Sequence, residues 1–138
     1  MNIEKQLYQA AIALIEKRYP SGWGGASAMH TEDGRILTSV APDVINASTE
    51  LCMETGAILE AHKYHLKVTH TICVVRDDDD ASYRVLTPCG VCQERLFYWG
   101  EDVKAAITTT DDELVYITLK EIQPYHWYKA YENDSDSH

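Results

Sequence analysis

The chain has 138 residues, of which 45% are apolar and 25% charged, a composition that is typical of one globular domain with a single core. Its formal net charge of −10, without any stripe of lysine or arginine, argues against nucleic acid as a partner, because an acidic surface repels phosphate. No apolar run approaches the length of a membrane span, so a membrane is not an expected partner either, whereas a small neutral or cationic substrate meets no electrostatic barrier.

The first predicted element is an amphipathic helix over residues 3–18. Its apolar side chains recur at helical spacing, and the turn-forming residues 19–22 then end it. Glu4 and Glu16 interrupt the segment, and no basic leader precedes an apolar stretch, so the pattern is not that of a signal peptide. We therefore expect a cytoplasmic location.

The rest of the chain alternates between short extended runs and helical patterns. Extended runs predict strands at 23–29, 35–40, 68–76, 83–86, 103–109 and 114–118. Helices are predicted at 50–65, capped by Ser48 or Thr49, at 88–98, opened by Pro88, and at 119–122. Turns or loops are predicted at 31–34, 41–51, 77–80 and 111–113.

This order of elements predicts the domain organisation. Strands that alternate with helices form a sheet with helices packed on its faces, which is an α/β class. Residues 1–132 are expected to form the single domain. The polar residues 133–138 are predicted to be a disordered tail, as is common at chain ends.

The four cysteines divide into one plus three. Cys73 lies within an apolar run and is expected to be an inert core thiol. Cys52, Cys89 and Cys92 remain, and an odd number favours three thiolates on one metal ion over disulfide pairs.

The stretch TPCGVCQER, residues 87–95, contains a Cys-x-x-Cys that alone fits a redox pair, a metal site or simple packing. Its spacing places Cys89 and Cys92 on one side of a first helical turn, where the helix N-terminus favours thiolates. Cys52 lies at the start of another predicted helix. Three thiolates at two helix N-termini suit zinc, which takes sulfur ligands tetrahedrally.

Glu54 favours a catalytic over a structural zinc site. A closed structural site needs a fourth ligand, and no such residue follows at short spacing. Instead, a carboxylate stands two residues after Cys52. Such a group can accept a proton from a metal-activated water and donate it to a leaving amine.

Two motifs carry a family resemblance. The sequence Cys52-x-Glu54, followed by Pro88-Cys89-Gly90-x-Cys92, resembles the signature of zinc-dependent cytidine deaminases. Residues 33–36 resemble the first hairpin of that family, and residues 121–124 resemble its Glu-Leu-Leu-Pro stretch. With a cysteine as its first ligand, the chain resembles the small, usually tetrameric branch of the family, which also contains the blasticidin-S deaminases.

The resemblance implies a fold, a cofactor and a reaction. The implied fold is a three-layer α/β/α arrangement around a central five-stranded mixed sheet. Zn²⁺ is expected on Cys52, Cys89 and Cys92, with Glu54 as the proton shuttle. The implied reaction is hydrolytic deamination of cytidine, deoxycytidine or a modified cytosine nucleoside to the uridine form, with release of ammonia, as in pyrimidine salvage. A homotetramer is favoured over a dimer.

The resemblance also implies substrate contacts. Trp23 matches an early aromatic residue that flanks the substrate, Thr87 contributes backbone contacts, and Trp127 reaches the site of a neighbouring subunit. Ala41 and Asp43 stand where ribonucleoside-binding relatives carry Asn and Glu. The side chain of Ala41 cannot hydrogen-bond, so a weaker or different recognition of the sugar is expected.

A second departure concerns charge. Relatives carry arginine where this chain has Thr55 and Gln93, and those arginines offset the thiolates. Arg95 is the candidate for a replacement here. Without one, the site is more negative and the metal-bound water less acidic.

Several alternatives stay open from the sequence. The nearest is an aminonucleoside antibiotic deaminase of the blasticidin type, and a polynucleotide deaminase is disfavoured by the acidic charge. A zinc-stabilised binding protein without activity leaves Glu54 unexplained, as does a redox pair. Two tempting ligand sets are rejected: His62, His65 and His70 lie too far from Cys52, and the acidic run 77–80 lacks the spacing of a calcium loop.

Overall fold

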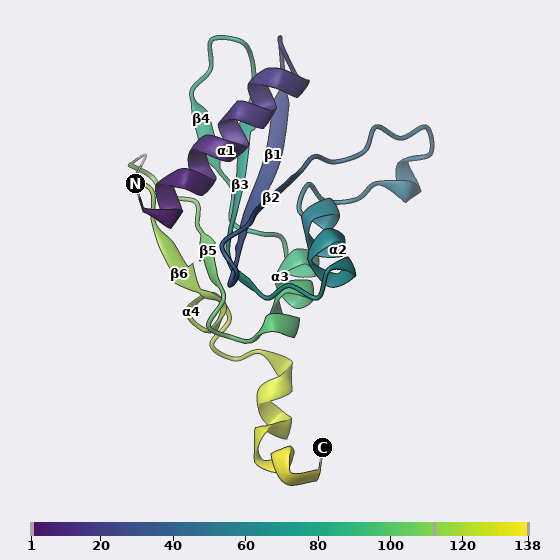
Figure 1. The fold of residues 1–138 in the computed structure, drawn as a ribbon, viewed down its shortest axis with the longest axis vertical. Coiled ribbons are helices and arrows are strands. Elements are labelled where there is room, and N and C mark those ends of the chain that lie inside the picture. Colours follow the sequence, from purple (N-terminus) through teal and green to yellow (C-terminus); the bar gives the residue numbers. More distant parts are fainter. Residues whose placement is uncertain (1, 112, 138) are drawn as a thin grey trace.

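The computed structural model describes residues 2–111 and 113–137, the last five of these by their backbone alone (Figure 1). The strands are β1 Gly24–Thr31, β2 Ile36–Ser39, β3 Val68–Arg76, β4 Tyr83–Val85, β5 Lys104–Ala106 and β6 Tyr116–Thr118. The α-helices are α1 Ile3–Arg18, α2 Thr55–Lys63, α3 Gly90–Leu96 and α4 Leu119–Ile122. Three 3₁₀ segments are η1 Ala47–Thr49, η2 Phe97–Trp99 and η3 Trp127–Ser137.

The strands form one mixed sheet in the order β2-β1-β3-β5-β6. The β3–β5 pair is parallel, and the other pairs are antiparallel. β4 pairs with the end of β3 as a sixth strand, so the sheet has one strand more than the five that the resemblance implied. β4 lies off the five-strand path because it pairs only with the last three residues of β3, whereas β5 pairs with β3 nearer its start.

Two cores lie on opposite faces of this sheet. Along β1, Ala26 and Ala28 pack with α1, whereas Met29 packs with α2 and α3, as the alternation of side chains along a strand requires. The α1 core includes the buried Leu7, and the α2–α3 core includes the buried Leu96. The result is three layers, α1, sheet, then α2 with α3, which confirms the predicted α/β/α class (Figure 1).

The start of α2 corrects the predicted helix over 50–65. The helix begins at Thr55, and neither Ser48 nor Thr49 caps it. Their hydroxyls donate instead to Asn46, Ser48 Oγ to Asn46 Oδ1 at 2.7 Å and Thr49 Oγ1 to the Asn46 carbonyl at 2.7 Å. The two side chains therefore close the separate turn η1, and Cys52 lies in the connection that follows, before the helix.

The second predicted helix, over 88–98, is also shorter. α3 begins at Gly90, with Cys89 as an extended N-cap residue, so Pro88 precedes the helix and does not form its first turn. The chain then tightens into η2 after Leu96. Strands β5 and β6 are shorter than the predicted 103–109 and 114–118, and residue 112 of the predicted turn lies outside the described residues.

The chain ends in η3, which projects from the body of the molecule in Figure 1. The predicted disorder of 133–138 stays a prediction, and His138 lies outside the described residues. None of the helices that the structure describes is long and apolar enough to cross a membrane.

The α1 layer generates a stability prediction. Leu7 is fully buried, whereas Glu16 on the same helix is exposed. Leu7→Ala removes buried contacts and leaves a cavity, so we expect a loss of about 2–5 kcal/mol in the free energy of unfolding. The control Glu16→Ala, on the solvent side of α1, should change it by about 0.5 kcal/mol or less. Urea denaturation of both variants measures the difference, and equal effects would contradict the assignment of α1 to the core.

Candidate active site

Three cysteine thiols converge on the α2–α3 side of the sheet. Cys52 lies in the turn before α2, Cys89 occupies the N-cap position of α3, and Cys92 lies in the first turn of α3. Their Sγ atoms all lie within 4.8 Å of one another, and the Cys52 and Cys89 sulfurs are 3.3 Å apart. In the described part of the chain, no histidine or carboxylate joins this group. The structure thus brings together the three predicted ligands.

The spacing of the thiols fits a zinc ion. Tetrahedral zinc with Zn–S bonds of about 2.3 Å places its sulfurs about 3.8 Å apart, within the observed range. The burial is graded: Cys92 is buried, Cys52 is half-buried and Cys89 is exposed. A metal held here would be enclosed by the protein on one side and open to a small molecule on the other.

The local environment gives the three thiols different acidities. Partial burial opposes ionisation of Cys89, but hydrogen bonds from the backbone N–H groups of Cys92 and Val91, together with those from the Cys52 and Cys92 side chains, outweigh it and lower the pKa of Cys89. Burial raises the pKa of Cys52, and the neighbouring Cys89 adds to that effect. Burial also raises the pKa of Cys92, with the negative charge of Glu54 as the next cause. The start of α3 therefore favours a thiolate at Cys89 first.

Glu54 is a buried carboxyl beside this cluster. It is 3% exposed and occupies the N-cap position of α2, although its side chain does not cap the helix. Burial raises the pKa of Glu54, and hydrogen bonds from its own backbone and from Cys92 only partly oppose that shift. The carboxyl therefore lies next to the cysteine cluster with its proton held more tightly than on a free glutamate, as suits a group that takes up and returns protons.

The turn that carries Cys52 and Glu54 is held by β2. Ser39 Oγ donates to the backbone carbonyl of Met53 at 2.5 Å. A Cβ atom on Gly56 would lie 2.8 Å from the Cβ of Ser39, so only glycine lets the first turn of α2 approach the strand this closely. Sequence reasoning missed Ser39, because nothing in a single strand residue indicates which turn it contacts.

Trp23, a predicted substrate residue, lies at the same turn. A Cβ atom on Gly25 would lie 2.5 Å from Met53 Sδ and 3.0 Å from Trp23 Cη2, so the ring and the thioether meet over this glycine. Met53 is the residue between Cys52 and Glu54. Trp23 is 48% exposed, so part of the residue is accessible to solvent near Met53.

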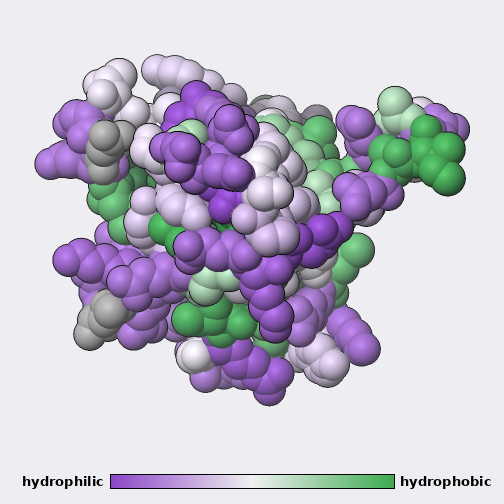
Figure 2. Space-filling model, turned by 90° about the horizontal axis from the view of Figure 1, so that it is seen from above, coloured by the Kyte–Doolittle hydropathy of each residue, from purple (hydrophilic) through white to green (hydrophobic). Residues whose placement is uncertain are grey.

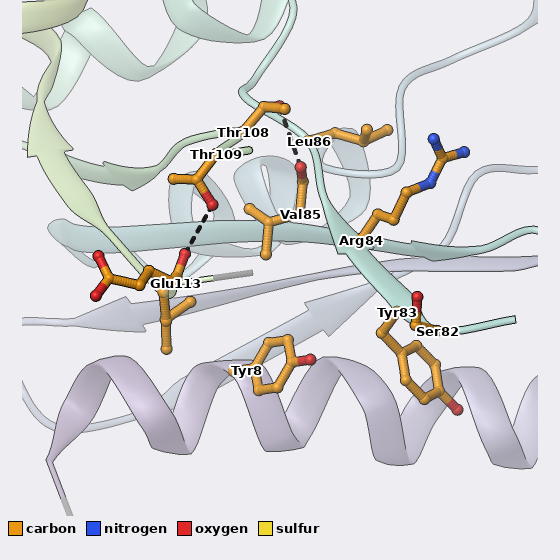
Figure 3. Close-up of a pocket in the computed structure, with 10 residues that line it drawn as sticks. Tyr8, Ser82, Tyr83, Arg84, Val85, Leu86, Thr108, Thr109 and Glu113 are labelled. Atoms are coloured by element: carbon orange, nitrogen blue, oxygen red, sulfur yellow. Dashed lines mark hydrogen bonds between the residues drawn. The ribbon is translucent and has the colours of Figure 1, made fainter. Parts of the chain in front are cut away.

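Thr87, the residue before Pro88, is hydrogen-bonded to Thr108, two residues after the end of β5. The Thr87 backbone N–H donates to Thr108 Oγ1 at 3.1 Å, and the Thr108 N–H donates back to Thr87 Oγ1 at 2.9 Å. Thr108 also lines a pocket of about 520 Å³ between α1, β4 and the connection from β5 to β6, with Tyr8 of α1 and Tyr83 of β4 in its lining (Figure 3). No cysteine lines that pocket, so it is separate from the cluster.

Thr55 and Gln93, the two positions that depart from the family pattern, both form side-chain hydrogen bonds. Gln93 is buried, donates to the Pro88 carbonyl at 2.6 Å and accepts from Gln123 Nε2 at 2.5 Å. Arg95 Nη1 donates to Thr55 Oγ1 at 3.2 Å, which places its guanidinium beside the start of α2. Gln93 thus links the loop before Cys89 to the end of α4, a contact that the sequence did not indicate.

The remaining predicted substrate residues lie elsewhere in this chain. Asp43 is highly exposed and forms an ion pair with Arg18 at 3.0 Å. Trp127 donates to Glu94 at 2.8 Å and lines an apolar groove of about 860 Å³ on the α2–α3 side. Ala41 is half-buried at the start of the connection that leaves β2. None of the three is in the group of cysteine thiols.

Comparison with known proteins connects this arrangement to deaminases. No protein-family model matches the chain. A blasticidin-S deaminase of Bacillus cereus is 31% identical over 102 residues, which cover 71% of this chain and 72% of that protein. The crystal structure of a cytidine deaminase from Bacillus anthracis is 61% identical, covers 99% of this chain and 97% of its own, and superposes with a TM-score of 0.95.

A more distant structure shares the fold alone. The cytidine deaminase of Mycobacterium leprae is 22% identical over 90% of this chain and 99% of its own, with a TM-score of 0.70. Taken with the closer relatives, the fold and the cysteine cluster define a hydrolase that acts on C–N bonds. The chain belongs to the cytidine deaminase family.

The cysteine cluster generates a prediction about metal content. Cys89→Ala removes an exposed ligand candidate, so the fold should survive while zinc affinity falls at least about 100-fold. Cys73→Ala is the matched control: its Sγ lies 3.9 Å from Met53 Sδ, outside the group of three, and its buried thiol has a raised pKa. Competition with a chromophoric chelator measures both. Equal zinc affinities in the two variants would exclude this cluster as the metal site.

Proposed function

We propose that the chain catalyses the hydrolytic deamination of cytidine, deoxycytidine or a related cytosine nucleoside. The observation that supports this most strongly is the buried Glu54 carboxyl beside three convergent thiols of which one side is open. The blasticidin-S deaminase relative supports the same type of reaction on a modified cytosine nucleoside.

We propose Cys52, Cys89 and Cys92 as the residues that hold zinc. The fit rests on the donor set and on sulfur separations that match tetrahedral zinc. When bound, the metal supplies Lewis acidity that makes a water molecule a stronger nucleophile. Arg95, which lies beside Thr55 at the start of α2, is proposed to offset part of the negative charge of the thiolates.

Glu54 is proposed as the proton shuttle. Its carboxylate accepts a proton from the attacking water and delivers it to the ring nitrogen N3, while the water oxygen bonds to C4. The second water proton then passes through Glu54 to the amino group, the C4–N bond breaks, and ammonia leaves. Burial favours this cycle, because the raised pKa of Glu54 lets the carboxyl hold a proton between the two transfers.

The substrate ring is proposed to lie against Trp23, whose accessible part stands next to the turn of Cys52 and Glu54. Backbone groups of Thr87, which Thr108 holds in place, are proposed to contact the ring. The sugar is expected to meet fewer side-chain hydrogen bonds, since Ala41 offers none and Asp43 is paired with Arg18. We therefore propose broad tolerance toward the sugar.

A cytoplasmic homotetramer is the proposed state. Apolar and aromatic side chains are exposed on two parts of the surface: Ile45 in the connection between β2 and α2 is fully exposed, and Leu59, Tyr98 and Trp127 are at least 60% exposed around the 860 Å³ groove. Figure 2 shows apolar side chains gathered at the end of a protruding segment. Contiguous exposed apolar surface is typical of an interface. Trp127 is proposed to approach a neighbouring subunit's site.

An ultraviolet assay on zinc-loaded protein tests the function. Loss of absorbance with cytidine or deoxycytidine is expected, with blasticidin S run in parallel. Turnover of blasticidin S alone would assign the chain to the antibiotic-deaminase alternative. No turnover of any of the three, with zinc bound, would contradict the proposed substrate class.

The role of Glu54 has a separate test. Glu54→Gln keeps the size and the hydrogen-bonding capacity of the side chain but cannot carry a proton, so we expect kcat to fall about 10³-fold with zinc content unchanged. The control Glu50→Gln alters an exposed carboxylate two residues before Cys52 and should retain activity. A Glu54→Gln enzyme as fast as the wild type would refute the shuttle.

A further inference from the structure

Arg76 is a buried cation that the proposed reaction does not use. It ends β3 and is 6% exposed. In the described part of the chain its guanidinium forms no ion pair and donates to two backbone carbonyls, Nε to Gly22 at 3.0 Å and Nη2 to Tyr19 at 2.5 Å. Charge-assisted bonds of this kind are strong, and a buried guanidinium is stable only when such partners are in place.

The geometry places Arg76 on the far side of the sheet from the cysteines. Arg76 pairs across the strands with Gly24, and a Cβ atom on Gly24 would meet Ile15 of α1. Tyr19 is the C-cap residue of α1, so the guanidinium also lies at the negative end of that helix, where a cation is favourable. Arg76 therefore cannot touch a substrate at the cysteine cluster, and any effect on it passes through the backbone.

Both backbone polar groups of Gly22, its carbonyl and its N–H, are hydrogen-bonded to side chains. Arg76 binds its carbonyl, and the carboxylate of Asp79, in the acidic turn after β3, accepts from its backbone N–H. Gly22 has a φ of +76°, a left-handed conformation that a non-glycine residue adopts only with strain. With both groups and the dihedral constrained, the direction in which the chain enters the next residue is set.

That next residue is Trp23. Its ring makes an edge-to-face contact with Tyr19, with centroids 5.5 Å apart, and reaches over Gly25 to Met53. The same guanidinium thus binds the carbonyl of the ring's aromatic neighbour and the carbonyl of the residue before the ring. A single side chain holds the two backbone points from which the orientation of Trp23 follows.

We propose that Arg76, assisted by Asp79, is a positioning residue that holds Trp23 against the turn of Cys52 and Glu54 and so sets the affinity for the nucleoside. This inference rests on the proposed function. It assigns a role to the acidic turn 77–80 as well, because Asp79 in that turn binds Gly22, the residue before Trp23.

Steady-state kinetics test the proposal. Arg76→Met keeps most of the side-chain volume and removes both donors, so we expect KM for cytidine to rise about 10-fold while kcat stays within about 2-fold. The matched control Arg84→Met removes an exposed arginine that pairs with Asp77 of the same acidic turn, and its KM should not change. An unchanged KM in Arg76→Met overturns the proposal.

A double-mutant cycle separates positioning from general stability. If Arg76 acts through Trp23, Trp23→Ala together with Arg76→Met should raise KM no more than Trp23→Ala alone. If KM of the double variant rises by the product of the two single-variant factors, Arg76 acts by a route other than Trp23, and the proposal is overturned. If Arg76→Met does not fold, Asp79→Ala is used in its place: it alters an exposed side chain, and KM should rise about 3-fold, again not beyond that of Trp23→Ala.

A fluorescence experiment does not depend on activity. The chain has three tryptophans, so Trp99→Phe with Trp127→Phe leaves Trp23 as the single reporter. In that background Arg76→Met, or Asp79→Ala, should shift the emission to the red and raise acrylamide quenching about 2-fold, because the freed ring becomes more exposed. Unchanged quenching overturns the positioning role. If the wild type deaminates no cytosine nucleoside but quenching still increases in Arg76→Met or Asp79→Ala, the proposed function is refuted. The role of Arg76 in positioning Trp23 then still holds.

Discussion

The convergence of three thiols within 4.8 Å is the constraint on which the rest of the structure depends. Cys52 arrives from the turn before α2, and Cys89 and Cys92 from the start of α3, so two helix starts must meet above one strand region. Both helices pack in the same core on one face of the sheet, which makes that meeting possible. Close approach at Gly56 and the Ser39 hydroxyl then hold the Cys52 turn in place.

Electrostatics distribute the roles within this small volume. The N–H groups at the start of α3 lower the pKa of Cys89, whereas burial raises the pKa values of Cys92 and of Glu54. One end of the cluster therefore favours negative charge and the other opposes it. Because a divalent cation would offset the penalty for ionising the buried thiols, the cluster suits three thiolate ligands beside a carboxyl whose pKa is raised.

The site depends on both faces of the sheet. Cysteines and Glu54 occupy the α2–α3 face, while Arg76 works from the α1 face through Gly22 to Trp23. Gln93 joins the loop before Cys89 to the end of α4 in a similar way. Arg76 and Gln93 are both buried, and both donate to backbone carbonyls of connecting segments. Such bonds are favourable because a buried carbonyl without a partner is costly.

Local patterns in the sequence determined the helix over 3–18, the strand over 68–76 and the α/β class, since periodicity is a property of neighbouring residues. The grouping of Cys52 and Glu54 with Cys89 and Cys92, 37 positions further on, came from the odd number of remaining cysteines and from the resemblance of the two motifs to a family signature. Local patterns did not determine where α2 begins, because Ser48 and Thr49 bind Asn46 and not the helix. Nor did they determine the contacts of Ser39, Arg76 and Gln93, or the pairing of Asp43 with Arg18. These join residues that are distant in sequence, and only the packing of helices on the sheet decides which of many possible partners meet.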